Sequence, residues 1–65
     1  MDKLRAIQYF NQAAASGSFA AAARLLQVSA PAVVQLVRAL EAQLGSVLFH
    51  RTTQGIALTA AGERY

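Results

Sequence analysis

The sequence predicts a mainly α-helical fold that ends in a short β-hairpin. Apolar residues recur at every third or fourth position as far as Leu44, and capping or terminating residues divide that pattern into three helices. After Gly45, two short apolar runs flank a turn-like segment. A chain of 65 residues makes one domain at most, and a domain of this size buries about 60% of its unfolded surface.

Two amphipathic helices are expected in the first 26 residues. The first covers roughly residues 3–15, where an apolar stripe is formed by Leu4, Ile7, Phe10 and Ala14. Ser16-Gly17-Ser18 ends this helix, and Ser18 is a good N-cap for the next one. The second helix carries its own apolar stripe at Phe19, Ala22, Ala23 and Leu26.

The third helix has clear start and stop signals. Ser29 can cap it, Pro31 lies in the first turn, where a missing N–H costs little, and Gly45 is a natural stop. The helix is therefore expected over about residues 29–44, with a core face at Val33, Val37, Leu40 and Leu44. Because only residues 26–28 connect it to the second helix, the two form a helix-turn-helix pattern.

A hairpin is predicted after the third helix. Val47–His50 is the first expected strand, residues 52–55 are the turn, and Ile56–Leu58 is the return strand. An isolated hairpin is unstable, so this one should lean on the helices, held there by Leu48 and Phe49.

A fourth helix can begin at Ala60 with Thr59 as its cap. The predicted architecture is a winged helix-turn-helix of three helices and a two-stranded wing, followed by the start of a fourth, linker helix. We expect the winged domain to cover residues 1–58, and residues 59–65 to begin a truncated linker and dimerisation helix.

Composition favours an anionic partner. Six Lys or Arg residues against three Asp or Glu residues give a net charge of +3 and a pI near 10.2. This balance suits nucleic acid or an anionic membrane surface, although it also fits a mildly basic soluble domain. The uncharged run Ala6–Ala23 contains polar residues and the break at residues 16–18, so it is not expected to span a membrane. The N-terminus lacks the order of a signal peptide, and a cytoplasmic location is the default.

Catalytic and metal-binding groups are sparse. The carboxylates Asp2, Glu41 and Glu63 are far apart in sequence, cysteine is absent, and His50 is the one histidine. His50 is therefore expected to be a wing residue, and neither an enzyme, a metal site nor a cofactor is predicted.

A helix-turn-helix followed by a wing is a DNA-binding arrangement. The N-terminal half of the third helix would enter the major groove, and the wing would reach the backbone or the minor groove. One run of residues also matches a known family in register: Ser18-Phe19, Ala22-Ala23, Leu26, Ser29, Pro31-Ala32-Val33, Leu40-Glu41, Leu44-Gly45, Leu48-Phe49, Arg51, Leu58-Thr59 and Ala61-Gly62. On these residues the chain resembles the N-terminal domain of LysR-type bacterial transcriptional regulators.

The resemblance implies a domain that binds double-stranded promoter DNA. In that family the site is partly palindromic and the protein binds it as a dimer. The helix that begins at Thr59 would continue into a long dimerising linker, followed by a small-molecule-sensing domain. A homodimer or higher oligomer is therefore expected through that helix, with no membrane partner.

The expected DNA-binding residues lie on the third helix and the wing: Ser29, Ala30, Pro31, Val34, Gln35, Arg38, Arg51, Thr52, Thr53 and Gln54. Ser29 is first a cap and could add a phosphate contact. Pro31 stiffens the first turn and could touch a sugar or base edge. Gln35 could pair with an adenine edge, and Arg38 would meet a phosphate or solvent.

The chain departs from the family at three positions of this helix. The family usually has Gln at position 30, Ser at 34 and Gln at 36, whereas this chain has Ala30, Val34 and Leu36. Leu36 is expected to extend the core. Two interpretations of Ala30 and Val34 stay open: apolar contact with thymine methyl groups, or weakened direct readout with specificity moved to Gln35, the wing or DNA shape.

The expected wing contacts are modest. Arg51 could contact phosphate or form an ion pair with Glu41, and Thr52 and Thr53 are candidate phosphate donors. The wing tip often carries Arg or Lys in this family, but here it is Gln54. With so few cations, DNA binding should be weak and only slightly salt-dependent.

Two alternatives to a DNA-binding function stay open. One is a winged-helix module that binds protein, and the other is a basic helical segment that acts at membranes.

Overall fold

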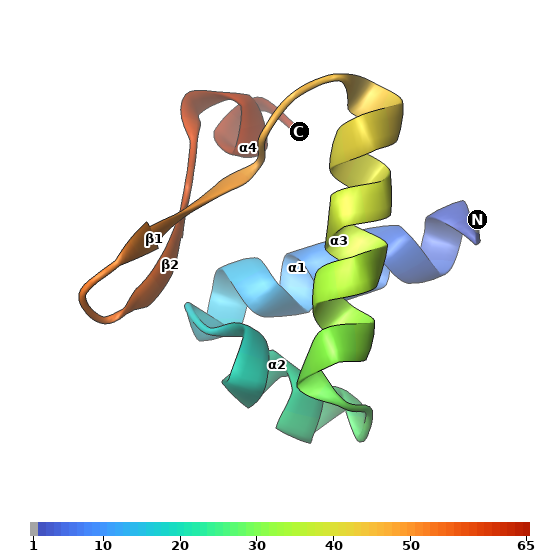
Figure 1. The fold of residues 1–65 in the computed structure, drawn as a ribbon, viewed down its shortest axis with the longest axis vertical. Coiled ribbons are helices and arrows are strands. Elements are labelled where there is room, and N and C mark those ends of the chain that lie inside the picture. Colours follow the sequence, from blue (N-terminus) through green and yellow to red (C-terminus); the bar gives the residue numbers. More distant parts are fainter. Residues whose placement is uncertain (1) are drawn as a thin grey trace.

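The computed structural model describes residues 2–65, which form four helices and one two-stranded sheet (Figure 1). The elements are α1 (Lys3–Ser16), α2 (Phe19–Leu26), α3 (Ala30–Leu44), β1 (Phe49–Thr52), β2 (Gly55–Leu58) and α4 (Ala60–Arg64). α3 crosses α1, α2 packs at the N-terminal end of α3, and the β1–β2 hairpin stands beside α3 as a wing. The predicted mainly α winged helix-turn-helix is confirmed.

The predicted helix caps form. The side-chain oxygens of Ser18, Ser29 and Thr59 accept hydrogen bonds from backbone N–H groups three residues later, at 3.2, 3.2 and 3.0 Å. At the other end of α3, Gly45 adopts a left-handed conformation with φ +70°, as the predicted stop requires. Because the chain leaves α2 through the left-handed Gln27, α2 and α3 meet at a bend of 108°, within the range of helix-turn-helix pairs.

The core lies where α1, α2 and α3 meet the wing. Its buried members are small or branched apolar residues, together with two phenylalanines: Ala6, Phe10, Ala13, Ala22, Ala23, Val33, Val37, Leu40, Leu48, Phe49 and Ile56. The rings of Phe10 and Phe49 lie 5.2 Å apart between centroids, and Phe19 packs edge-on against Phe49 at 5.6 Å. Leu48 and Phe49 therefore hold the wing against the helices, as predicted.

Two predicted core leucines are exposed. Leu4 is 67% exposed because it lies two residues, or about 200° of helical rotation, from buried Ala6. Leu44 is 38% exposed, although it lies on the same face of α3 as Leu40. It is in the last turn of α3, whereas α1 crosses that helix nearer its middle (Figure 1). For α3 the periodicity identified the buried face but not where the partner helix ends, and for α1 the predicted stripe was rotated from the buried face of Ala6, Phe10 and Ala13.

The wing is shifted relative to the prediction. β1 begins at Phe49, two residues later than expected, and Thr52 and Gly55 pair with each other, so the turn consists of residues 53–54 alone. The cause lies before β1, where the carbonyl of Val47 accepts a hydrogen bond from the hydroxyl of Thr59 at 2.6 Å. This contact belongs to the start of α4 and not to the β ladder.

α4 packs closely on the chain that leads into β1. The backbone N–H of Thr59 donates to the carbonyl of Leu48 at 3.0 Å, and buried Gly62 lies so close to that carbonyl that a Cβ would overlap it. The division of the chain into a domain of residues 1–58 and a linker helix from residue 59 stays a prediction.

Among the described residues, no single helix is long and apolar enough to cross a membrane. α2 and α3 reach that criterion only when they are combined across their bend.

Candidate nucleic-acid interface

The exposed face of α3 is a narrow strip. Pro31, Gln35 and Arg38 are all exposed, and their spacings of four and three place them on one side of the helix. Val33, Val37 and Leu40, on the opposite side, are at most 1% exposed. Leu36 packs against the core, which confirms the prediction made for it. Gln35 and Arg38 thus lie on the side of α3 opposite its buried face.

Ser29 and Pro31 begin this strip. The Oγ of Ser29 accepts from the N–H of Ala32, which confirms its capping role and leaves its own O–H free to donate. Both residues are exposed, as a contact with the DNA backbone would require. Gln35 lies on the side of α3 nearer α1, where it lines a shallow depression with Asp2, Tyr9 and Leu36.

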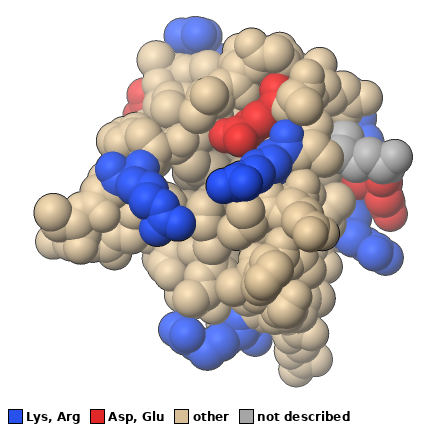
Figure 2. Space-filling model, viewed as in Figure 1, with Lys and Arg blue, Asp and Glu red and all other residues tan. Residues whose placement is uncertain are grey.

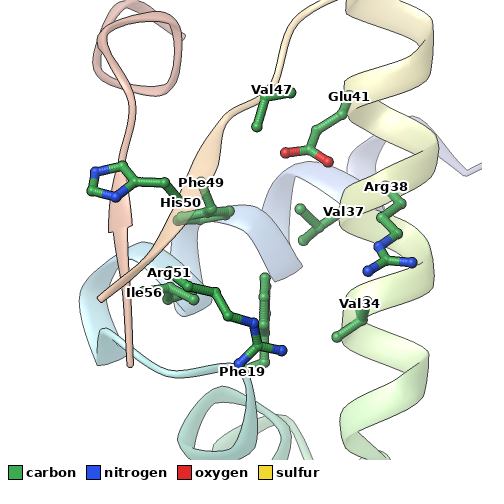
Figure 3. A pocket seen from close by; sticks show the side chains of 10 residues that line it. All are labelled: Phe19, Val34, Val37, Arg38, Glu41, Val47, Phe49, His50, Arg51 and Ile56. Atoms are coloured by element: carbon green, nitrogen blue, oxygen red, sulfur yellow. The ribbon is translucent and has the colours of Figure 1, made fainter. Parts of the chain in front are cut away.

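A hollow of about 240 Å³ separates the wing side of α3 from β1 (Figure 3). Its floor is apolar, formed by Phe19, Val37, Phe49 and Ile56 among others. Two guanidinium groups line it from different elements: Arg38 from α3 and Arg51 from β1. Arg51 extends toward α3 and Val34 points back toward it. The fold therefore brings Val34, Arg38 and Arg51 together from positions up to 17 residues apart.

Charge on this face is mixed. Figure 2 shows basic side chains on either side of the hollow and an acidic side chain above it. The acidic group is Glu41, whose Oε2 accepts a hydrogen bond from the backbone N–H of Leu48 at 2.8 Å. Among residues 2–65 the ion pair within 4 Å joins Arg5 to Asp2, so the predicted alternative of an Arg51–Glu41 pair is wrong. The carboxylate of Glu41 accepts its hydrogen bond from the backbone of Leu48, and the guanidinium of Arg51 is not paired with it.

A second hollow of about 280 Å³ adjoins the first on the α2 side. Ala30 and Val34, one helical turn apart, line it together with Ala20 of α2 and Arg51 and Gly55 of the wing. Val34 lines both hollows. The two residues that depart from the family pattern thus share one side of α3, between its exposed strip and the wing.

The wing tip is exposed and its turn is self-supported. Thr52, Thr53 and Gln54 are all exposed, and the Oγ1 of Thr52 accepts from the N–H of Gln54 at 3.2 Å. Neither Thr53 nor Gln54 lines the two hollows beside α3. The predicted site is therefore divided in two. Arg51 lies with the residues of α3, and the wing tip is separate from them.

The sequence interpretation missed two features of this surface. His50 and Val47 line the hollow that Arg38 and Arg51 share, although His50 was expected only to lie in the wing. The wing is also held by a backbone hydrogen bond at 3.0 Å from Ile56 N–H to the carbonyl of Gly17, between α1 and α2. Neither follows from residue spacing, since both depend on the tertiary position of the hairpin. Within residues 2–65, no three His, Asp or Glu side chains gather as a metal site.

Comparison with known proteins agrees with this geometry. The family model of the bacterial regulatory helix-turn-helix protein, lysR family, matches residues 4–63. The HTH-type transcriptional regulator ClcR of Pseudomonas putida is 44% identical over 63 residues, which are 97% of this chain and 21% of ClcR. The chain thus spans about a fifth of the length of that relative.

Solved structures of similar domains have the same fold. The protein in the crystal structure of the CbnR_DBD–DNA complex is 48% identical, with a TM-score of 0.87 over 92% of this chain and 69% of that one. The protein in the BenM_DBD/catB site 1 DNA complex is 30% identical, with a TM-score of 0.88 over 98% of this chain and 68% of that one. These likenesses do not favour the protein-binding alternative. The chain belongs to the lysR family of bacterial regulatory helix-turn-helix proteins.

Proposed function

We propose that this winged helix-turn-helix, the DNA-binding domain of a LysR-type transcriptional regulator, binds double-stranded promoter DNA through α3 and the wing. The N-terminal half of α3 would lie in the major groove and the wing on the backbone or minor groove. The observation that carries the proposal is that the exposed strip of α3, formed by Pro31, Gln35 and Arg38, adjoins the wing, because Arg38 lines the same hollow as Arg51 of β1. Domains similar to this one have been crystallised with DNA.

The proposed contacts divide into positioning and reading groups. Ser29, Arg38, Arg51, Thr52 and Thr53 offer N–H or O–H donors, which suit phosphate oxygens. Gln35 offers the paired donor and acceptor that match an adenine edge. Pro31 and Gln54 would add contacts at the start of α3 and at the wing tip. The proposed role is binding, not catalysis.

The proposal extends to the longer protein. A helix that begins at Thr59 would continue as the linker through which two or more copies associate, so that two domains bind the halves of a partly palindromic site. Since the proposed partner is promoter DNA, the proposed location is the bacterial cytoplasm.

Titration with a duplex tests the proposal. Duplexes bound by the 65-residue chain would be selected from a random library at low salt, and amide chemical shifts would be followed as a selected duplex is added. We expect shifts to concentrate at residues 29–38 and 51–54. Selection of no duplex, or shifts confined to α4 and the exposed end of α1, would contradict the proposal.

A further inference from the structure

Val34 is an apolar residue of α3 that lies outside the hydrophobic core. It is half-buried, but it does not pack against the buried cluster, whereas its neighbours Val33 and Val37 are 0% and 1% exposed. A β-branched residue is not a favoured choice for helix propensity alone. Neither packing nor propensity therefore accounts for valine at this position.

Its surroundings place it within the proposed DNA surface. Val34 points from α3 toward Arg51 of the wing, and Arg38 follows one helical turn later on the exposed strip (Figure 3). Ala30 lies one turn earlier and lines the same hollow as Val34 and Arg51. An apolar patch thus adjoins two guanidinium groups, whose charge complements that of the phosphate backbone.

The chemistry of the major groove identifies what such a patch can accept. Among the groups that base pairs present there, the C5-methyl of thymine is the apolar one, and the other groups are hydrogen-bond donors or acceptors. A donor or acceptor held against Val34 would lose its water without gaining a partner. The patch therefore attracts thymine and at the same time disfavours the exposed edges of guanine and cytosine.

We infer that Val34, flanked by Ala30, reads thymine C5-methyl groups in the major groove and is a specificity-determining residue of this domain. The inference rests on the proposed function and deepens it, because it assigns a base preference to the apolar side of α3. It also selects between the two interpretations that the sequence leaves open for these positions.

Deoxyuridine provides a direct test, since it differs from thymidine only by the missing methyl group. Each thymine of a duplex selected by the 65-residue chain would be replaced in turn by deoxyuridine, and affinity measured by fluorescence anisotropy. Burial of one methyl group corresponds to roughly a fourfold change in affinity. We expect a loss of about this size at one or two thymines and none at the others.

The protein side of the test uses Val34→Ser and a matched control. Val34→Ser should abolish the sensitivity to deoxyuridine at those thymines, whereas Leu4→Ser should keep it, because Leu4 is exposed on α1 away from both hollows. Val34→Ala removes two methyl groups and favours the helix, so it should also abolish the sensitivity to deoxyuridine. It replaces Val34→Ser in the test if that variant does not fold.

The outcomes separate this inference from the proposed function. Selection of no duplex overturns both. A duplex that is selected and bound equally well after every deoxyuridine replacement overturns the thymine-reading role alone. Sensitivity that persists unchanged in both Val34→Ser and Val34→Ala overturns it as well. Sensitivity that is lost in these variants and kept in Leu4→Ser supports it.

Discussion

The carboxylate of Glu41 on α3 accepts a hydrogen bond from the backbone N–H of Leu48, with Oε2 and N 2.8 Å apart. Leu48 is only 1% exposed, so water has little access to that N–H group. Glu41 therefore ties the last turns of α3 to the chain that enters the wing. It does so within the hollow lined by Arg38 and Arg51, where it also adds negative charge to the proposed DNA surface.

Removing the charge and removing the acceptor should have different effects. Glu41→Gln keeps an oxygen for Leu48, so we expect stability to change by less than about 1 kcal/mol and DNA affinity to rise about fivefold, as for one surface charge interaction. Glu41→Ala leaves the N–H unpaired and should cost about 1–3 kcal/mol. Urea denaturation and anisotropy measure the two quantities. Weaker DNA binding by a stably folded Glu41→Gln would contradict this assignment.

The junction between the wing and the first two helices should be intolerant of a side chain at Gly55. Gly55 has φ +142°, and a Cβ there would overlap the carbonyl oxygen of Gly17. Since that carbonyl also accepts the Ile56 N–H, it cannot move freely. We expect Gly55→Ala to cost about 3 kcal/mol or more. Gly45→Ala is the matched control, because a Cβ there meets only open space and the cost should be about 1 kcal/mol. Equal losses in thermal denaturation would be inconsistent with a close wing junction.

Local signals predicted the elements of this fold well. The capping side chains of Ser18, Ser29 and Thr59 each accept a hydrogen bond from the N–H three residues later, so their roles follow from the local sequence. The exposed positions of Leu4 and Leu44 did not follow: Leu4 lies off the face of α1 that is buried, and Leu44 lies beyond the part of α3 that α1 covers (Figure 1). The start of β1 depends on the contact between Val47 and Thr59, which lie 12 residues apart.

The candidate site was predictable as a set of residues but not as a surface. Spacing along α3 places Gln35 and Arg38 outward, as found. Two other features depend on the position of the wing. Arg51 faces Val34 across a hollow, and the carboxylate of Glu41 accepts a hydrogen bond from the N–H of Leu48. The wing position in turn depends on the backbone of Gly17, whose carbonyl carries no residue-specific signal in the sequence.

The turn of the helix-turn-helix offers a stabilising substitution. Gln27 is exposed, with φ +60°, a left-handed conformation that costs an L-residue about 1–2 kcal/mol and glycine nothing. Gln27→Gly should raise the free energy of unfolding by about 0.5 kcal/mol, after the loss of backbone freedom on folding is subtracted. Gln43→Gly, at an exposed position inside α3, should lower it by about 0.5–1 kcal/mol. A stability change of the same sign in both variants would show that the conformation of Gln27 is not strained.

The scarcity of cations beside α3 predicts a shallow dependence of DNA binding on salt. Among the proposed contact residues only Arg38 and Arg51 carry a positive charge, so each domain should release counterions from about two phosphates, with a slope of log K against log salt near −2. Arg51→Ala should weaken binding and reduce the magnitude of the slope by about one. Arg64→Ala, which removes a cation from α4 outside both hollows, should leave the slope nearly unchanged. Anisotropy titrations of the 65-residue chain at four or more salt concentrations measure all three slopes. Tight, sequence-selective binding by the monomeric chain at physiological salt, or equal slopes for Arg51→Ala and the unsubstituted chain, would mean that contacts other than these two arginines hold the DNA.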